Sequence, residues 1–348
     1  MVSRVAQLQN ALKKKRMDWL LVSSEPNIRW LTGESNLGAT VIIPAKAEPI
    51  IITTEFERMR LPTGFRPYIV KKRNWWREIS NIVGRGRVGY EDADLSVRQL
   101  QQARKYIKAK LVPASEPITK LREVKTSDEV VKIKRALQIT VAGMEAVRKA
   151  LKPGITEREL AAVAESAMRR AGADWFAFDT IISSGPQSAI PHMGITDRKI
   201  RPHDLVIVDI GAKFDGWCAD MTRTFCIKPG PKERTIYNTV LKMRATALKK
   251  IKVGQKAAVV DFAARDVARR LGLGKAFIHG LGHGVGVDIH ESPSISEHSK
   301  DRLRPGMVFT IEPGLYFSGW GGVRIEDMFL LTASGPKLLT KFPHRLIP

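Results

Sequence analysis

The 348-residue chain has little cysteine, too few acidic residues to balance its basic ones, and no long hydrophobic run. A secreted chain of this length would usually carry more than the two cysteines present, Cys218 and Cys226, so they agree with a reducing compartment. We interpret both as buried thiols, with a disulfide or a thiolate ligand as the alternative. No stretch approaches the ~18 apolar residues of a membrane span. The N-terminal segment also lacks the apolar core of a secretory signal. We expect a cytoplasmic protein with no membrane partner.

The shortage of acid gives a net charge of +23, from 58 Lys and Arg against 35 Asp and Glu. Residues 1–120 hold 22 of the basic and 11 of the acidic residues, about twice the positive charge per residue of the remainder. Such basic clusters can attract nucleic acid without specificity. No recognisable nucleic-acid module accompanies them, so we interpret them as a solvated basic surface and expect no specific nucleic-acid binding.

Histidine is absent from the first 120 residues, and all seven histidines lie from His192 onward. The first part alternates strand-like and helix-like runs, which is typical of a small α/β domain. The expected strands are Trp19 to Val22, Thr40 to Ile43, Ile50 to Thr53 and Val88 to Tyr90, and the expected helices cover residues 2–15, 75–83 and 95–109. The predicted domains are 1–120 and 121–348. Only the second can supply imidazole chemistry.

Two capping-box patterns open the second part. Thr126 with Glu129, and Thr156 with Glu159, have the spacing that marks helix N-termini. The first pattern predicts a long helix that stops before Pro153-Gly154.

Two acidic residues lie where core strands should be apolar. The stretch Leu205 to Phe225 has the pattern of two apolar strands joined by a Gly-containing turn, and it carries Asp209 and Asp220. A carboxylate in a buried strand is costly unless positive charge compensates it. The pattern therefore favours a metal ion.

The same pattern occurs again further along the chain. Arg201 to Gly211 aligns without a gap on Arg304 to Gly314, so that Asp209 matches Glu312. The offset also carries Trp217 onto Trp320, so the two copies share a turn as well as a strand.

The second acid of each copy matches only approximately. Asp220 corresponds to Glu326 if the turn at Gly321-Gly322 holds an insertion or bulge. A helix upstream of each hairpin is also repeated, as Lys152 to Gly172 and Lys252 to Gly272. Two similar half-domains facing each other would bring four carboxylates together at the pseudo-symmetry axis.

A glycine-rich run supplies histidines to this candidate centre. Phe277 to Glu291 contains His279, His283 and His290, and its glycines permit close backbone approach to a ligand. One histidine with four carboxylates suits Mn, Co or Zn and is too acidic a set for one structural zinc. Four negative charges balance two divalent cations, so we expect a dinuclear site.

The motifs VDIGAKFDGWCADMTRTF, HGLGHGVG, TIEPG and VRIED together resemble those of the pita-bread metallopeptidases, namely methionine aminopeptidases, aminopeptidase P and prolidase. The likeness covers about residues 120–340. The five ligands it implies are Asp209, Asp220, His283, Glu312 and Glu326. The first domain is similar to that of prolidase and aminopeptidase P, which methionine aminopeptidases lack. The resemblance therefore implies cleavage before proline by a homodimer with an α/β first domain and a pita-bread second domain.

The resemblance also implies roles for single residues. Asp209 would bind one metal through both oxygens, Asp220 and Glu326 would bridge the two metals, and Glu312 would be ligand and general base for the attacking hydroxide. His192 and His290 match family histidines that contact the substrate and the tetrahedral intermediate. The remaining candidate pocket residues are Phe178, His279, Tyr316 and Arg324, of which Arg324 is expected to orient a carboxylate.

One position departs from the family pattern. Prolidases often carry an arginine after the HExP run to hold the carboxylate of a dipeptide, whereas this sequence has Ser294. Losing a charge-assisted clamp weakens discrimination for dipeptides over longer peptides, and Arg302 or Arg304 is a candidate substitute. The sequence thus favours an Xaa-Pro dipeptidase, with an Xaa-Pro aminopeptidase as the alternative. A non-enzymatic binding protein on the same fold is the third possibility, against which the intact ligand set argues.

Overall fold

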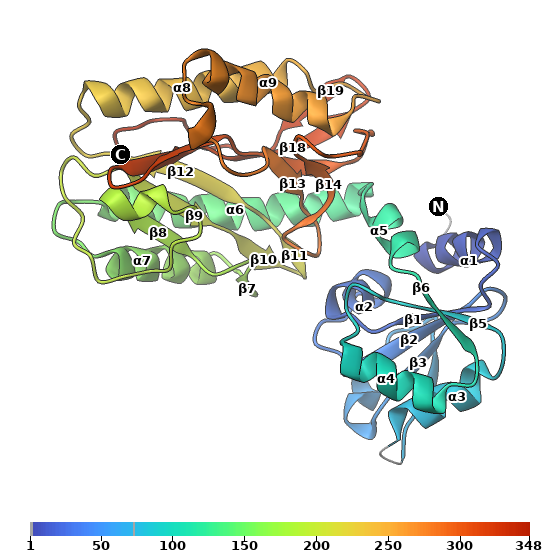
Figure 1. Ribbon diagram of the computed structural model, residues 1–348. Helices are drawn as coiled ribbons and strands as arrows, with labels where there is room; N and C mark the ends of the chain where they lie inside the picture. Colours follow the sequence, from blue (N-terminus) through green and yellow to red (C-terminus); the bar gives the residue numbers. More distant parts are fainter. Residues whose placement is uncertain (1–2, 72–73) are drawn as a thin grey trace. The chain divides into compact units, whose positions relative to one another are not determined.

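The computed structural model describes residues 3–71 and 74–348, and the chain divides into two compact units, Met1–Arg122 and Glu123–Pro348 (Figure 1). No helix within these described ranges is both long and apolar enough to cross a membrane. The two units are called the N-terminal unit and the C-terminal unit below.

The N-terminal unit is a mixed six-stranded sheet with helices packed on it, in the strand order β4-β3-β2-β1-β5-β6. Its strands are β1 (Trp19–Val22), β2 (Ala39–Pro44), β3 (Ile50–Thr53), β4 (Arg66–Ile69), β5 (Arg87–Tyr90) and β6 (Lys110–Pro113). Its helices are α1 (Arg4–Lys14), α2 (Glu25–Thr32), α3 (Trp75–Val83), α4 (Val97–Tyr106) and α5 (Glu116–Arg122), with a 3-10 helix η1 at Glu55–Arg60. Residue 2, included in the first expected helix, lies outside the described residues.

The strands that the sequence pattern missed are the two edges of this sheet. Each of β4 and β6 pairs with one neighbour only, and neither contains a fully buried residue. An edge strand needs no continuous apolar run, so it leaves a weak signal. The central strands β1 and β3, by contrast, begin and end at the predicted residues.

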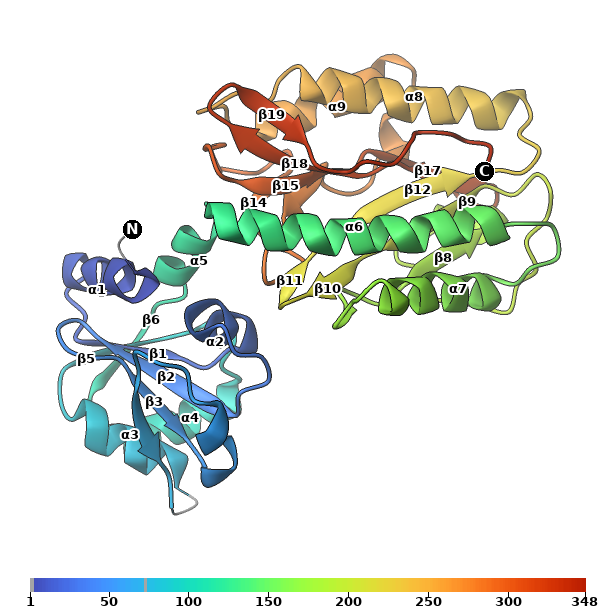
Figure 2. The same ribbon diagram turned by 180° about the vertical axis from the view of Figure 1, so that it is seen from behind.

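The C-terminal unit contains two similar halves (Figures 1 and 2). The first half comprises α6 (Ser127–Ala150), α7 (Glu157–Arg170), β7 (Trp175–Phe176), β8 (Ile181–Ser184), η2 (Gly185–Ala189), β9 (Val206–Ile210), β10 (Ala212–Phe214), β11 (Trp217–Cys218) and β12 (Met221–Phe225). The second comprises α8 (Pro231–Leu248), α9 (Ala257–Arg270), η3 (Gly274–Ala276), β13 (Gly282–Gly284), β14 (Glu291–Ile295), β15 (Val308–Ile311), β16 (Gly314–Phe317), β17 (Gly321–Arg324), β18 (Asp327–Thr332) and β19 (Gly335–Leu338).

Both predicted capping boxes are present. The Thr126 hydroxyl accepts a hydrogen bond from the backbone N–H of Glu129, and the Glu129 carboxylate accepts one from the backbone N–H of Thr126. Thr156 and Glu159 make the same pair of hydrogen bonds. These caps start α6 and α7 at the expected residues because each satisfies two otherwise unpaired N–H groups.

The strand register shows how the two acid-bearing hairpins correspond. In the first hairpin Phe214 pairs with Trp217, which leaves a two-residue loop. In the second Phe317 pairs with Gly321, so the loop is one residue longer. The predicted insertion therefore lies before Gly321, in the loop rather than in the following strand.

The same register corrects the match between Asp220 and Glu326. Thr222 pairs with Asp209 in the first copy, while the second register sets Glu326 opposite Glu312, so the counterpart of Glu326 is Thr222. The counterpart of Asp220 is Arg324. The second acid has moved by two residues, which keeps it on the same face because strand side chains alternate.

Candidate active site

A cavity of about 520 Å³ opens in the C-terminal unit at the edge where the two halves meet. Ten of the eleven predicted site residues line it, namely Phe178, His192, Asp209, Asp220, His279, His283, His290, Glu312, Arg324 and Glu326. Tyr316 differs from the expectation, because it is buried behind the wall and contacts two of the lining residues.

Each carboxylate is held by an apolar strand of a half-domain. Asp209 lies within β9, whose other residues are all buried, and Glu312 follows directly after β15. Asp220 and Glu326 each precede the partner strand, β12 or β18. Asp209, Asp220 and Glu326 are all less than a tenth exposed, so the strands force these acids into a poorly hydrated interior.

His283 is aimed at the acids by a short, irregular strand. The register between β13 and β14 shifts between His283 and Gly284, and such a bulge redirects a side chain. A Cβ on Gly282 would lie 2.1 Å from the Thr310 carbonyl oxygen, so the backbone passes too close for any other residue. The His283 Nε2 atom faces Asp220 Oδ2 at 3.5 Å and Glu312 Oε1 at 3.3 Å.

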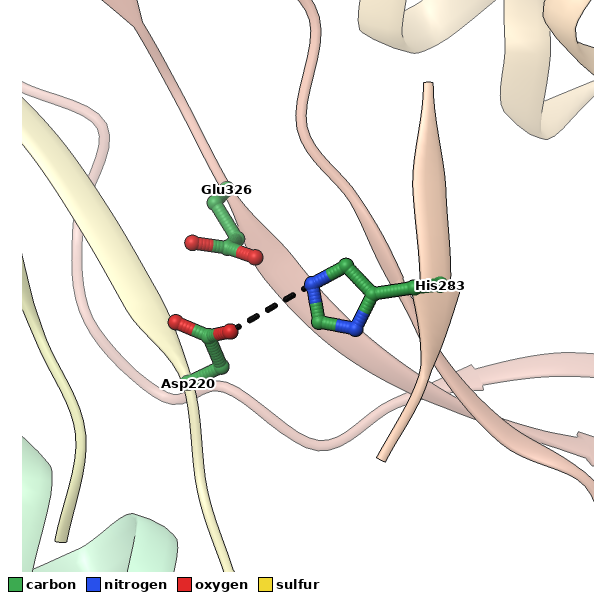
Figure 3. Close-up of side chains that lie close together, drawn as sticks. All are labelled: Asp220, His283 and Glu326. Atoms are coloured by element: carbon green, nitrogen blue, oxygen red, sulfur yellow. Dashed lines mark ion pairs between the residues drawn. The ribbon is translucent and has the colours of Figure 1, made fainter. Parts of the chain in front are cut away.

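The ligand-type atoms of Asp220, His283 and Glu326 lie within 4.8 Å of one another (Figure 3). Nδ1 of His283 lies 3.1 Å from the Gly284 carbonyl oxygen. If Nδ1 carries the proton, it donates to that oxygen and the Nε2 lone pair points at the acids. This is the arrangement of a histidine that binds a metal.

Burial dominates the electrostatics of the cluster. It raises the pKa of Asp220 and of Glu312 well above their usual range, with the Glu326 charge as the next cause for both. It also raises the pKa of Glu326 to about 7, with Asp209 as the next cause. Burial and the nearby His290 lower the pKa of His283 to about 4, which leaves its imidazole neutral at pH 7.

The charge balance and the unpaired atoms fit a cation. Among the lining side chains in the described part of the chain, only Arg324 is a permanent cation, whereas the lining includes Asp179 as well as the four carboxylates of the cluster. Asp209 Oδ1 and Glu326 Oε1 are buried with no hydrogen-bond partner among the described residues. Buried carboxylates are paired or bind metals because desolvating an isolated charge is very unfavourable. The donor set of four carboxylates and one neutral imidazole therefore fits divalent metal ions.

Arg324 connects the acids to His279 through Tyr316. Arg324 Nη2 donates to Asp209 Oδ2 at 2.7 Å, and Nη1 donates to the Tyr316 hydroxyl at 2.8 Å. Burial raises the pKa of Tyr316 to about 12, so its hydroxyl keeps its proton. That proton is directed to His279 Nε2, at 2.9 Å, because a guanidinium can only donate. His279 Nδ1 then donates to the Gly280 carbonyl at 2.7 Å. Burial lowers the pKa of His279 to about 3, which agrees with this neutral tautomer.

Tyr316→Phe is expected to lower the free energy of unfolding by about 1–3 kcal/mol, because it leaves buried polar groups without their partner. Tyr237→Phe is the matched control, since the buried Tyr237 hydroxyl has no hydrogen-bond partner among the described residues. Urea unfolding at equal metal content should show a loss for Tyr316→Phe and none for Tyr237→Phe. Equal losses in the two variants would contradict this account of the Tyr316 hydroxyl.

The predicted substrate histidines lie at the open side of the acid cluster. His290 packs edge-on against His283, with ring centroids 4.3 Å apart, and burial lowers its pKa. His192 and Phe178 line the same cavity from the segments around β8. The structure therefore brings both histidines beside the cluster, where donors to a reacting carbonyl are needed.

Two threonines at the site were missed by the sequence analysis. The Thr222 hydroxyl donates to Glu326 Oε2 at 2.7 Å, and the Thr310 hydroxyl donates to Glu312 Oε1 at 3.2 Å. Each lies two residues from an acid in the sequence, after Asp220 or before Glu312. The period of two along a strand could have identified both.

The suggested substitutes for the missing arginine point elsewhere. Arg302 Nη1 donates to the Gly254 carbonyl at 2.8 Å, Arg304 pairs with Glu123, and neither lines the cavity. Ser294 is exposed and pairs across strands with His283. The expectation that Arg302 or Arg304 supplies a carboxylate clamp is therefore not supported.

Residues 131–333 match the model of metallopeptidase family M24, and residues 4–124 match that of the creatinase/prolidase N-terminal domain. The chain belongs to metallopeptidase family M24. These matches confirm the predicted metallopeptidase and the predicted fold class, an N-terminal α/β domain followed by a pita-bread domain. The family implies divalent metal ions, for which the Asp220, His283 and Glu326 cluster is the candidate site.

Similar proteins cover the M24 chain almost completely. It is 35% identical to an Xaa-Pro dipeptidase of Pyrococcus furiosus over 349 residues, and the matched region covers 100% of each chain. An Xaa-Pro dipeptidase from Bacillus anthracis has a TM-score of 0.94 at 32% identity, covering 99% of this chain and 98% of that one. An X-Pro aminopeptidase from Thermotoga maritima has a TM-score of 0.87 at 29% identity, covering 95% and 97%. The M24 protein is thus prolidase-like, with similarity to both kinds of enzyme.

Proposed function

We propose that this M24 peptidase hydrolyses the peptide bond before proline, with Xaa-Pro dipeptides as its first substrates. The observation that carries the proposal is the convergence of three buried carboxylates, the half-buried carboxylate of Glu312 and the neutral His283 in a single cavity. Full-length similarity to proteins named Xaa-Pro dipeptidase supports the choice of substrate.

The proposed cofactors are two divalent metal ions, with Mn, Co and Zn as candidates. The proposed ligands are Asp209, Asp220, His283, Glu312 and Glu326. When bound, such ions lower the pKa of water from 15.7 towards ~7 and polarise a carbonyl group. The neutral His283 needs no deprotonation to act as a ligand. Thr222 and Thr310 orient the carboxylates that they contact, as outer partners of metal ligands commonly do.

Glu312 is proposed as the general base. Its oxygen accepts a hydrogen bond from Thr310 and faces His283, which fixes the carboxylate at the mouth of the cluster. Burial raises the pKa of Glu312, which favours proton uptake by its carboxylate. Glu312 takes a proton from the attacking water and later delivers it to the leaving proline nitrogen.

The two cavity histidines are proposed to hold the substrate. His192 and His290 lie beside the cluster and can donate N–H groups to the scissile carbonyl as negative charge develops on its oxygen. Phe178 and His279 are proposed to complete the wall against which the substrate packs.

Cleavage of longer Xaa-Pro peptides is the second candidate. Among the residues that the structure describes, Arg324 is the one guanidinium in the cavity lining, and it already donates to Asp209 and Tyr316. A dipeptide carboxylate therefore meets no uncommitted arginine in the lining, while a longer peptide needs none. Side-by-side hydrolysis of Met-Pro and Met-Pro-Gly tests the proposal. Cleavage of the dipeptide alone supports the first candidate, release of methionine from the tripeptide supports the second, and cleavage of neither contradicts both.

Ser294→Arg is expected to raise the ratio of kcat/KM for Met-Pro over Met-Pro-Gly by about tenfold or more. A hydrogen bond to a charged group contributes about 1.5–3 kcal/mol, and Ser294 is exposed next to the His283 strand. Ser294→Ala is the control and should leave the ratio unchanged. An unchanged ratio in Ser294→Arg would show that this position does not face the carboxyl end of the substrate.

A further inference from the structure

A second concave surface lies between α8 and α9, and it shares no lining residue with the active-site cavity. This groove has a volume of about 580 Å³. Its exposed apolar lining comes from Val259, Phe262 and Leu271, and the buried Ala263 and Val267 also line it. Its basic lining includes Lys242 and Lys250. Helices α8 and α9 pack against each other, and both lie at the side of the C-terminal unit opposite α7 (Figures 1 and 2). It is called the α8–α9 groove below.

The apolar residues of the α8–α9 groove are exposed although α9 already has a complete core face. Val260, Ala264 and Val267 pack into the core, whereas Val259 is 39% exposed, Phe262 54% and Leu271 51%. Adjacent exposed apolar side chains rimmed by charge mark interaction sites more often than isolated ones do.

The internal repeat provides a matched comparison for this surface. The buried positions 136, 137, 139, 140, 143 and 147 of α6 recur at 236, 237, 239, 240, 243 and 247 of α8. Helices α7 and α9 likewise cover 157–170 and 257–270. A shift of 100 residues therefore relates the two helix pairs, position by position.

Five of the groove residues are replaced in the first pair, whereas Arg270 is matched by Arg170. The counterparts of Val259, Phe262, Leu271, Lys242 and Lys250 are Glu159, Ala162, Ala171, Ala142 and Ala150, in that order. The same helix pair is thus built once with a small and polar outer face and once with an apolar and basic one. The fold does not require the second surface, so it needs another explanation.

We infer that the α8–α9 groove binds an acidic amphipathic helix of another protein. Lys242, Lys250 and Arg270 line it, and the acid in the lining, Asp266, pairs with Arg270 at 2.7 Å. An acidic ligand with apolar anchors complements this surface in both charge and hydropathy. A second copy of the chain fits less well, because it carries a net charge of +23 and a symmetric contact would oppose lysines.

The dimensions suit a short helix. Val259 lies in the first turn of α9 and Leu271 directly after its last residue, so they are twelve residues apart, which at 1.5 Å per residue is about 18 Å, or roughly three turns. A helix laid in a groove uses apolar anchors at i, i+3 or i+4, and i+7, over such a length. The apolar residues of the bound helix would lie in the groove between α8 and α9 and bury its exposed apolar side chains, and the acidic residues of that helix would face the two lysines.

The probe is a 16-residue lactam-stapled peptide with leucines at i, i+3, i+4 and i+7 and glutamates on the remaining face. Fluorescence anisotropy on the full chain should show saturable binding that weakens at least tenfold in Phe262→Ala and in Lys242→Ala/Lys250→Ala. The matched control, Lys149→Ala/Lys152→Ala, changes two lysines at the end of the other helix pair and should bind normally. An unchanged melting temperature shows that each variant is folded.

Several results would overturn the inference. They are equal binding of a scrambled peptide of the same composition, and binding that none of the groove substitutions weakens. Tighter binding of phosphatidylglycerol vesicles or of a 12-nucleotide RNA through Phe262 and the two lysines would assign the groove to another ligand. Loss of self-association in Phe262→Ala would assign it to a second copy.

Discussion

Replacing Glu312 with glutamine is expected to lower kcat/KM for Met-Pro by about 10²–10⁴, the usual contribution of a positioned general base. Glutamine keeps the size of the side chain and one oxygen, but it cannot accept the proton of the attacking water. The Thr310 hydroxyl that donates to Glu312 can still donate to an amide oxygen, so the cavity should keep its shape.

Glu312 is proposed as both ligand and base, and the two roles are separated by measuring metal content beside the rate. Glu297→Gln is the control, because Glu297 is exposed and pairs only with surface groups. A Glu312→Gln protein with full metal content and a large loss of kcat supports the base role. Full metal content with a wild-type kcat would rule that role out.

Removing the metal is expected to lower the melting temperature by roughly 8–16 °C. A cation present at 1,000 times its Kd adds about 4 kcal/mol to the folded state, and 1 kcal/mol shifts the melting temperature by about 2–4 °C in a domain of this size. Asp209, Asp220, Glu312 and Glu326 would otherwise repel one another in the interior. Calorimetry before and after chelation at pH 7.5 measures the shift, and adding the metal back should reverse it.

The metal-free protein should also become less stable as pH rises. Burial raises the pKa of Glu326 to about 7, above its ordinary value of 4.5. Its contribution is therefore fully present below pH 4.5 and lost as pH rises through 7, by about 3 kcal/mol. Asp220 and Glu312 shift in the same direction. Metal stabilisation should instead grow with pH, because the ligands bind deprotonated. An identical pH dependence of stability with and without metal would contradict the proposal that these acids bind the metal ions.

The acid cluster was predictable because the repeat places it twice. Asp209 lies within β9 and Glu312 directly after β15, at matching positions of the two copies, and neither strand needs a carboxylate to fold. The predicted match of Asp220 with Glu326 was wrong by two residues. The spacing from the turn to the second acid grows both when the loop is longer and when the acid lies further along the strand, so the sequence alone cannot distinguish these two cases. A shift of two residues along a strand leaves the side chain on the same face, so the predicted set of acids still lines one cavity.

Contacts between side chains were less accessible to sequence reasoning. Tyr316 was expected in the cavity wall, but its hydroxyl lies between Arg324 and His279 behind that wall. The edge strands β4 and β6 were missed because short segments without buried residues carry little periodicity. The helix α2 was also missed, because its eight residues cover only about two turns and five of them in a row are buried, so no apolar face stands out. The α8–α9 groove differs from the equivalent surface of the first repeat in the residues at five positions, and its apolar side chains are exposed.

The proposal of a two-metal peptidase is tested most directly by restoring the metal and measuring activity and metal content together. Protein stripped of metal is titrated with Mn, Co or Zn, and the bound ions per chain are measured beside the hydrolysis of Met-Pro and Met-Pro-Gly. The account predicts no hydrolysis by the stripped protein, and release of methionine from at least one of these peptides once two ions are bound. Undiminished hydrolysis without metal, or no hydrolysis with any of the three metals bound, would contradict it.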